Sequence, residues 1–182
     1  MDIVTITLNP ALDLTTRLGA MSLGEVNLVS EANLRAAGKG INVAMVLKDL
    51  GRDVGLTGWL GTDNQQSFVS LFEARALDDH FVRVAGSTRI NVKISEQSGR
   101  VTDLNLPGLT VHQAEVAALE AEIEKLAPRA DWFVLAGSLP HVDQIQRQQR
   151  GGQAGQGGGQ QGLFPCPHEN VFLRSMSVRP GD

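Results

Sequence analysis

The chain has 182 residues, a formal net charge of -4 and 42% hydrophobic residues. This length suits one domain able to bury a core, and the acidic balance provides no basic field to attract nucleic acid. No apolar run approaches the roughly 20 residues needed to cross a bilayer, and the N-terminus lacks the pattern of a signal peptide. We therefore expect a globular cytoplasmic protein with neither a nucleic-acid nor a membrane partner.

Cysteine and histidine are sparse. The single cysteine, Cys166, excludes an internal disulfide framework and leaves no cysteine pair for zinc. The four histidines are scattered, and none of them has the HExxH spacing that places two on one helical face. We therefore expect no metal site.

The first three quarters of the chain alternate between strand and helix patterns. A β-branched run at residues 3–8 ends at Asn9-Pro10, which predicts a buried strand feeding a turn. Further strands are expected at residues 54–60, 81–84 and 132–136. Apolar residues recur at helical spacing within 43–50, 68–72 and 116–126. Strands alternating with amphipathic helices predict a parallel α/β sheet with helices on its faces.

Two segments break this alternation, because residues 25–29 and 89–106 read as strands with no helix between neighbours. They predict a second, smaller antiparallel sheet. In the longer segment side chains alternate, so one face carries Ile90, Val92 and Ile94 and the other carries Arg89, Asn91 and Lys93. Ser98-Gly99 supplies a turn that predicts a hairpin.

A glycine-rich turn, Gly38-Lys39-Gly40, opens directly into the helix expected at 43–50. Glycines allow close approach of a ligand, the helix N-terminus offers unsatisfied N–H groups, and Lys39 adds a charge, so the turn suits an anion. Taken alone, the pattern is equally that of an ordinary turn before a helix. A P-loop would need glycine where Asn33 stands, and a dinucleotide fingerprint would need a small residue where Val43 stands.

A longer spacing resembles the first signature of the PfkB family of sugar kinases. It consists of Ala37-Gly38, Gly40, Asn42 and Ala44, followed by Gly51 and Gly61. Further segments are similar to the family's 1-phosphofructokinase branch: Thr7-Leu8-Asn9-Pro10-Ala11 with Asp13, Gly24-Glu25-Val26-Asn27, Thr88-Arg89-Ile90-Asn91-Val92-Lys93 and Ala136-Gly137-Ser138-Leu139-Pro140. The resemblance covers residues 1–140. It implies a ribokinase-like three-layer αβα sandwich with a small antiparallel β-sheet lid, here truncated.

The resemblance also implies roles for individual residues. Asp13 is expected to accept hydrogen bonds from sugar hydroxyls, although an aspartate here could equally stabilise a turn. Lys39 and Arg89 are the residues expected to bind the phosphate. Arg89 could instead be a strand residue that only contacts solvent. The remaining candidates for the substrate pocket are Gly38, Gly40, Asn42, Asn91 and Ser138. Asn42 could instead cap its helix, and Ser138 follows a strand, where α/β sheets bind ligands.

The activity implied by the resemblance is ATP- and Mg²⁺-dependent phosphorylation of fructose 1-phosphate to fructose 1,6-bisphosphate. Tagatose 6-phosphate and fructose 6-phosphate remain alternative substrates. The family's Asp-Thr-x-Gly-Ala-Gly-Asp motif, whose last aspartate is the catalytic base, does not occur in the chain. We therefore expect no catalytic residue and no ATP-binding residues here, and an inactive or unstable fragment is the competing reading. A homodimer through the lid sheet is a further expectation.

The composition changes after residue 140, where glutamine and glycine dominate residues 144–162. Such a tract cannot bury enough apolar surface to offset its ordering entropy. We expect residues 141–182 to be a disordered, non-homologous tail. A frameshift in the gene of a longer kinase would explain the change.

Overall fold

The computed structural model describes residues 1–142 and contains a five-stranded parallel sheet. Its strands run in the order β10 (Trp132–Leu135), β1 (Ile3–Thr7), β4 (Val54–Gly61) and β5 (Asp78–Asp79), with β6 (Val82–Val84) pairing the far end of β4. All pairs are parallel. The strands expected at residues 3–8, 54–60, 81–84 and 132–136 are confirmed. None of the described helices is long and apolar enough to cross a membrane.

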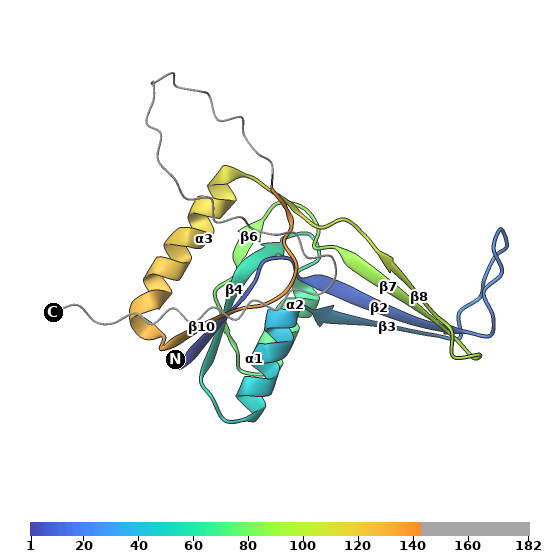
Figure 1. The fold of residues 1–182 in the computed structure, drawn as a ribbon, viewed down its shortest axis with the longest axis horizontal. Helices are drawn as coiled ribbons and strands as arrows, with labels where there is room; N and C mark the ends of the chain where they lie inside the picture. Colours follow the sequence, from blue (N-terminus) through green and yellow to red (C-terminus); the bar gives the residue numbers. More distant parts are fainter. Residues whose placement is uncertain (143–182) are drawn as a thin grey trace, which may run out of the picture.

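Helices cover both faces of this sheet (Figure 1). Strand β4 is buried along its whole length, and its side chains alternate between the two sides. Leu56 and Leu60 pack in a cluster with α1 (Lys39–Asp49) and α2 (Gln66–Ala74), where Phe72 stacks on Phe81 with ring centroids 5.6 Å apart. Trp59 faces the opposite cluster, beneath α3 (Gln113–Leu126). The three-layer αβα arrangement is therefore confirmed.

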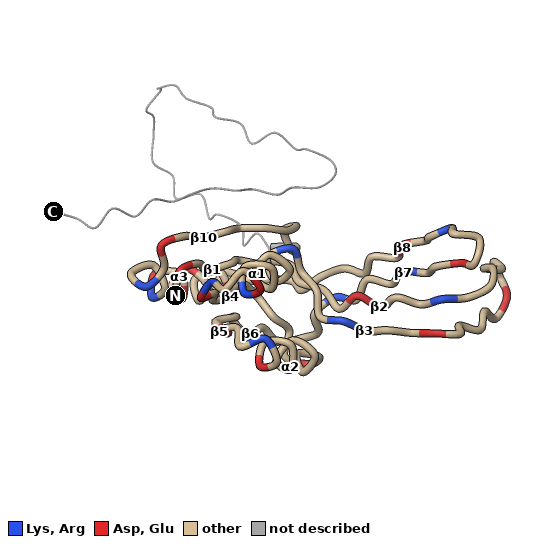
Figure 2. Tube along the Cα trace, turned by 90° about the horizontal axis from the view of Figure 1, so that it is seen from below, with Lys and Arg blue, Asp and Glu red and all other residues tan. Residues whose placement is uncertain are grey.

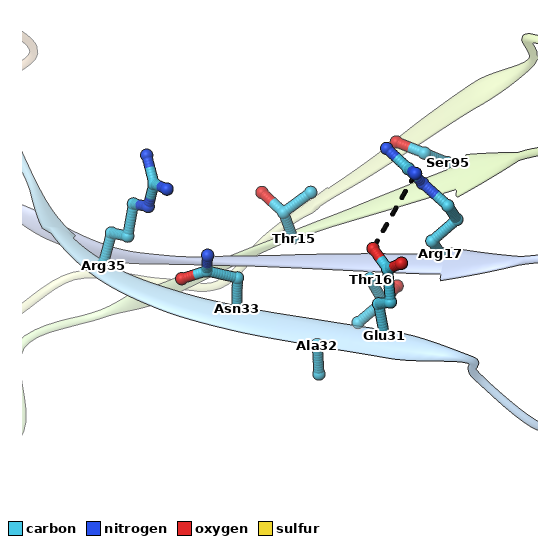
Figure 3. Close-up of a pocket in the computed structure, with 8 residues that line it drawn as sticks. All are labelled: Thr15, Thr16, Arg17, Glu31, Ala32, Asn33, Arg35 and Ser95. Atoms are coloured by element: carbon cyan, nitrogen blue, oxygen red, sulfur yellow. Dashed lines mark ion pairs between the residues drawn. The ribbon is translucent and has the colours of Figure 1, made fainter.

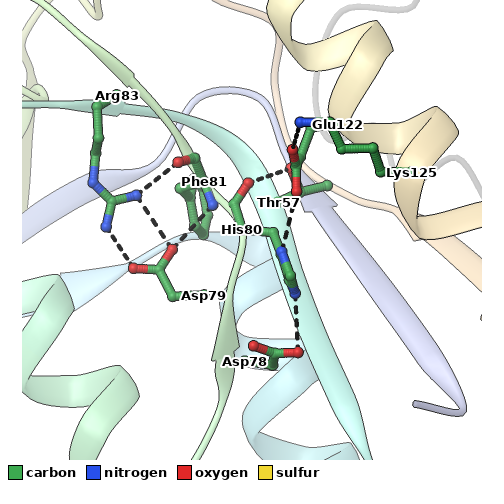
Figure 4. A network of polar contacts seen from close by, with 8 residues as sticks. All are labelled: Thr57, Asp78, Asp79, His80, Phe81, Arg83, Glu122 and Lys125. Carbon is green, nitrogen blue, oxygen red and sulfur yellow. Dashed lines mark hydrogen bonds and ion pairs between the residues drawn. The ribbon is translucent and has the colours of Figure 1, made fainter. Parts of the chain in front are cut away.

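A polar network ties α3 to the edge of the sheet (Figure 4). The His80 ring lies between two carboxylates, with Nε2 2.9 Å from Asp78 and Nδ1 3.1 Å from Glu122. Lys125 and His80 both lower the pKa of Glu122, Lys125 the more strongly, while partial burial opposes them. Thr57 on β4 donates to the His80 carbonyl at 2.9 Å. The network fixes the position of α3 far from the lid.

A second sheet, which we call the lid, projects from the main body (Figures 1 and 2). Its order is β3 (Glu31–Ala37), β2 (Ala11–Leu18), β7 (Ile90–Glu96) and β8 (Val101–Asn105). The outer pairs are antiparallel, but the central pair β2–β7 is parallel. The expectation of a purely antiparallel lid is thus corrected. Strands β2 and β7 follow the parallel strands β1 and β6, so both leave the main sheet in the same direction.

The expected strand at residues 25–29 is wrong, and the hairpin at 89–106 is confirmed. Residues 25–29 belong to the loop between β2 and β3 at the tip of the lid. The Asn27 side chain bonds the backbone N–H and carbonyl of Ser22, both at 2.8 Å, and the carbonyl of Glu25 at 2.9 Å. This local ring of hydrogen bonds replaces strand pairing. The alternating apolar residues remain in water, and Val26 is 90% exposed.

The described chain continues two residues into the expected tail. His141–Val142 form β11, which pairs in parallel with β9 (Thr110–Val111). A short 3-10 helix, η1 (Ala127–Arg129), links α3 to β10. The disorder expected from residue 141 is therefore corrected for these two residues. The rest of the expected tail, 143–182, lies outside the described residues.

Candidate site between the lid and the main sheet

Arg89 stands where the chain passes from the main sheet into the lid, directly before β7. The residue before it, Thr88, is fixed by hydrogen bonds with Asn64 and Gly61. Asn64 bonds both the N–H and the carbonyl of Thr88 at 2.8 Å, and the Thr88 hydroxyl accepts from the Gly61 N–H at 2.9 Å. Thr88 is buried. The backbone that carries the guanidinium is therefore fixed to the end of β4.

The Arg89 guanidinium points across the ends of β1 and β10. Its Nε lies 3.4 Å from the Pro10 carbonyl, and Nη2 lies 3.3 Å from the Asn9 carbonyl and 3.4 Å from Ser138 Oγ. Burial lowers the pKa of Arg89, and the nearby Asp13 carboxylate opposes this shift. An arginine titrates so far above neutral pH that the group stays cationic. The site therefore holds a partly desolvated positive charge.

Asp13 and Asn91 are directly opposite each other on the parallel pair β2–β7. The Asn91 amide donates to Asp13 Oδ1 at 3.0 Å. The carbonyl oxygen Oδ1 of Asn91 is buried and has no hydrogen-bond partner among residues 1–142. One Asp13 oxygen is thus occupied and oriented from within the protein, and the carboxylate can still accept further hydrogen bonds.

Gly38 and Gly40 lie against the end of β1. A Cβ on Gly38 would be 2.8 Å from Thr7 Cγ2, and one on Gly40 would be 2.3 Å from Thr7 Oγ1. Gly38 has a φ of 157°, and α1 begins at the next residue. Only glycine allows α1 to start this close to the strand.

Lys39 and Asn42 lie in the first turn of α1, and both are exposed. Within residues 1–142 neither side chain makes a hydrogen bond or ion pair. A Cβ on Gly137, in the loop after β10, would lie 3.8 Å from Lys39 Cβ. The structure thus forms two hydrogen-bonded pairs, Asp13–Asn91 and Arg89–Ser138, and Asp13 lies near enough to Arg89 to influence its pKa. Lys39 and Asn42 are bonded to neither pair.

A groove of about 760 Å³ opens beside Arg89. Its walls come from the loop after β8, the loop after β10 and the end of β1. The lining residues are Asn9, Arg89, Asn105, Leu106, Pro107, Gly108, Thr110, Leu139 and His141. Of these, sequence reasoning selected only Arg89 as a site residue. The turn at Asn9-Pro10 was visible, but nothing in the sequence placed it against residues about 100 and 130 positions away.

A second cavity of about 480 Å³ lies on the polar face of the lid (Figure 3). Thr15, Asn33 and Arg35 point to this face, while Ala32 points away. Arg17 and Glu31 close one end, 3.7 Å apart. In the β2–β3 pairing Asp13 is opposite Arg35, so the cavity continues the face that carries Asp13. The lid therefore presents one polar face running outward from the site.

No group of three or more His, Cys, Asp or Glu in residues 1–142 is close enough to hold a metal ion. The polar groups gathered between the lid and the main sheet are instead one cation, one carboxylate, amides and a hydroxyl. They suit a small ligand that carries both an anionic group and hydroxyls.

Comparison with known proteins agrees with this architecture. The family model of the pfkB family carbohydrate kinases matches residues 6–150. The chain belongs to the PfkB family of carbohydrate kinases. The family predicted from the sequence is therefore confirmed.

The most similar curated relatives include enzymes named 1-phosphofructokinase. The Vibrio cholerae enzyme is 54% identical over 145 residues, which are 80% of this chain and 46% of the relative. The Escherichia coli K12 enzyme is 47% identical over 138 residues, which are 76% of this chain and 44% of the relative. The chain therefore spans slightly less than half the length of these relatives.

Solved structures share the fold. A Thermotoga maritima protein described as a possible 1-phosphofructokinase has a TM-score of 0.69 and 28% identity, covering 78% of this chain and 46% of that chain. Phosphofructokinase-2 from Escherichia coli, in complex with fructose-6-phosphate, has a TM-score of 0.68 and 26% identity, covering 76% of this chain and 46% of that chain.

Proposed function

We propose that residues 1–142 form the sugar-phosphate side of a 1-phosphofructokinase-like site. The observation that carries the proposal is that two hydrogen-bonded pairs of residues lie between the lid and the main sheet. One is the Asp13–Asn91 pair, and the other is Arg89 with Ser138 at the ends of the parallel strands. Fructose 1-phosphate is the proposed ligand, with tagatose 6-phosphate and fructose 6-phosphate as alternatives of the same chemistry.

In this proposal the phosphate binds at the Arg89 end of the site. The guanidinium offers a planar set of donors, and its partial burial strengthens its attraction for a dianion. Ser138 adds a hydroxyl beside it. Lys39 makes no hydrogen bond or ion pair within residues 1–142 and stands at the start of α1, where the first N–H groups of a helix are unsatisfied, so it is the proposed source of a second charge.

The sugar hydroxyls bind at the Asp13 end. Asp13 accepts their hydrogen bonds, and the Asn91 amide holds one carboxylate oxygen in place. Gly38 and Gly40 let the start of α1 lie against the end of β1, and Asn42 offers both a donor and an acceptor from α1. Asn91 therefore acts through Asp13.

We further propose that this chain binds sugar phosphate without transferring phosphate to it. Phosphoryl transfer depends on positioning and on charge stabilisation around the moving group. The sequence has no counterpart of the Asp-Thr-x-Gly-Ala-Gly-Asp segment, and residues 1–142 gather no carboxylate cluster for Mg²⁺. ATP and Mg²⁺ belong to the reaction of the whole enzyme. The proposed location is the cytoplasm.

The apolar face of the lid supports a homodimer as part of the proposal. Leu34, Leu14, Val92 and Leu104 are opposite one another across all four strands, on the face away from Asp13. Leu34 is 47% and Leu104 is 49% exposed. A second copy covering this row would remove it from water. Size-exclusion chromatography with light scattering tests the dimer, and Leu34→Glu is expected to yield monomers.

Calorimetric titration of the full chain tests the binding proposal. Fructose 1-phosphate is expected to bind, and fructose without phosphate is expected to bind much more weakly. Asp13→Ala and Arg89→Gln should each abolish measurable binding, with circular dichroism confirming that the variants fold. Equal affinity for fructose and fructose 1-phosphate would refute a phosphate site.

A coupled assay with ATP, Mg²⁺ and fructose 1-phosphate tests the second part. The full chain is expected to show no turnover above a blank without protein. Measurable turnover would instead establish that this chain is a complete catalyst.

A further inference from the structure

The Ser138 hydroxyl receives two donors from the protein. Asn9 Nδ2 lies 3.2 Å and Arg89 Nη2 lies 3.4 Å from Ser138 Oγ. Both groups can only donate, and a hydroxyl has two acceptor positions and one proton. The two donors take up the acceptor positions. The hydroxyl proton is therefore directed away from both of them.

We infer that Asn9 is a positioning residue of the sugar-phosphate site, which together with Arg89 fixes Ser138 as a hydrogen-bond donor to a phosphate oxygen of the ligand. The inference rests on the proposed function. A ligand oxygen is the fitting partner because the hydroxyl needs an acceptor. We assign this acceptor oxygen to the phosphate of the ligand because the positive charge of Arg89 lies beside Ser138 Oγ.

The side chain of Asn9 has no free donor for a ligand. Its amide nitrogen carries two protons. One is donated to Ser138 Oγ, and the other is donated to the Leu139 carbonyl oxygen at 3.1 Å. The Asn9 backbone carbonyl accepts from Arg89 at 3.3 Å. The residue thus contacts both members of the phosphate site while its amide protons are used inside the protein. This is the arrangement of a residue that acts through its neighbours.

Gly108 lies directly beside the Asn9 side chain. A Cβ added to Gly108 would lie 2.5 Å from Asn9 Oδ1 and 3.3 Å from its Cγ. Such contacts are too close for carbon and oxygen, so an alanine here must displace the amide. Gly108 therefore provides a way to move Asn9 without altering its chemical groups.

The test measures fructose 1-phosphate binding to the full chain by calorimetry. Asn9→Leu keeps a side chain of similar size and removes both donors. We expect it to bind about five- to tenfold more weakly than the unsubstituted chain, the range of one or two hydrogen bonds. In a Ser138→Ala background the same change should have no further effect, because the hydroxyl that Asn9 positions is gone. A residue that only supported the fold would weaken binding in both backgrounds.

Gly108→Ala is the second variant. It should weaken binding to a similar degree and should likewise lose its effect in the Ser138→Ala background. Gly19→Ala is the matched control, because a Cβ at Gly19 meets nothing within 4 Å. Inorganic phosphate and fructose serve as separate probes, and the Asn9 effect should appear with phosphate but not with fructose. An effect seen only with fructose would mean that the Ser138 hydroxyl contacts the sugar and not the phosphate, and it would overturn the inference.

A measurement without ligand separates this inference from the proposed function. In nitrogen-15 correlation spectra the Arg89 Nε–H signal, assigned by its loss in Arg89→Lys, should shift in Asn9→Leu and stay in place in Gly19→Ala. If the unsubstituted chain binds no fructose 1-phosphate, the proposed function is wrong. If the Arg89 Nε–H signal does not shift in Asn9→Leu, the inferred positioning role of Asn9 is wrong. Full additivity of Asn9→Leu and Ser138→Ala also overturns it.

Discussion

The Asn91 amide donates to the Asp13 carboxylate at 3.0 Å across the parallel pair at the centre of the lid. One residue comes from the strand after β1, and the other comes from the strand after β6. The two segments that leave the main sheet are therefore joined by a charged hydrogen bond at the site, and such a bond is stronger than a neutral one.

Exchanging the two residues tests the role of this pair. The double variant Asp13→Asn/Asn91→Asp keeps one amide opposite one carboxylate, so its melting temperature should return close to that of the unsubstituted chain. The charge, however, moves from β2 to β7, and fructose 1-phosphate binding should stay at least about tenfold weaker. Thermal unfolding and calorimetry measure the two effects. Recovery of affinity would mean that the position of the charge is unimportant.

Replacing Arg89 with lysine should weaken fructose 1-phosphate binding by roughly 10- to 100-fold, the range expected for hydrogen bonds to a charged group. Lysine keeps the charge but cannot reach Pro10, Asn9 and Ser138 with one planar group. Arg75→Lys is the control, since Arg75 pairs with Asp49 on the surface at 2.8 Å. Unchanged affinity of Arg89→Lys would show that charge alone is sufficient.

Gly40→Ala should destabilise the fold by about 1–3 kcal/mol, as overpacking of a core does. The added Cβ would stand 2.3 Å from Thr7 Oγ1 and 3.0 Å from the Ile6 carbonyl oxygen. Urea unfolding measures the loss. Thr7→Ala in the same chain should restore part of it by removing the hydroxyl, but not all, because the Ile6 contact remains. A stable Gly40→Ala would indicate that α1 can shift away from β1.

The stability of the lid hairpin should depend on acid pH. Arg100 lies 2.5 Å from Glu96, and its hydrogen bond is the main cause that lowers the pKa of Glu96. A carboxyl group with a lowered pKa in the folded state adds stability above its unfolded pKa, and this stability is lost as pH falls through the folded pKa. Arg100→Gln should therefore lower the melting temperature at pH 7.

The same variant should differ less from the unsubstituted chain as the pH falls through the range where Glu96 becomes protonated. Arg52→Gln removes an arginine whose side chain makes no hydrogen bond or ion pair within residues 1–142, and it should show no such trend. A constant difference between Arg100→Gln and the unsubstituted chain at every pH would assign the effect to packing.

The sequence predicted the two central strands of the main sheet, β1 and β4, well because they are buried on both sides and read as largely apolar runs. Strand β4 is the clearest case, with every residue buried. The lid was harder to predict. Strand β3 is largely exposed. Its polar and apolar residues do alternate, but most of the apolar ones are small alanines, so the signal was weak. Val26 and Leu28, in contrast, gave an alternating signal in a loop. There the hydrogen bonds of Asn27 outweighed the pattern.

For the candidate site, the resemblance selected residues by their position in motifs. Asp13 bonds to Asn91, and Arg89 bonds to Ser138, because each of these residues stands where a strand enters the lid or leaves the main sheet. Asn9 was not selected. Its contacts with Ser138 and Gly108 arise from tertiary packing between distant segments, and no local pattern in the sequence encodes such contacts.

Every passage of the described chain between the main body and the lid occurs at the same place. The chain crosses from β1 to β2, from β3 to α1, from β6 to β7 and from β8 to β9. A tilt of the lid about this line would change the separation of Asp13 from Ser138. A molecule held by both residues therefore fixes the angle of the lid, and its occupancy should be detectable as slower hydrogen exchange in the crossing segments.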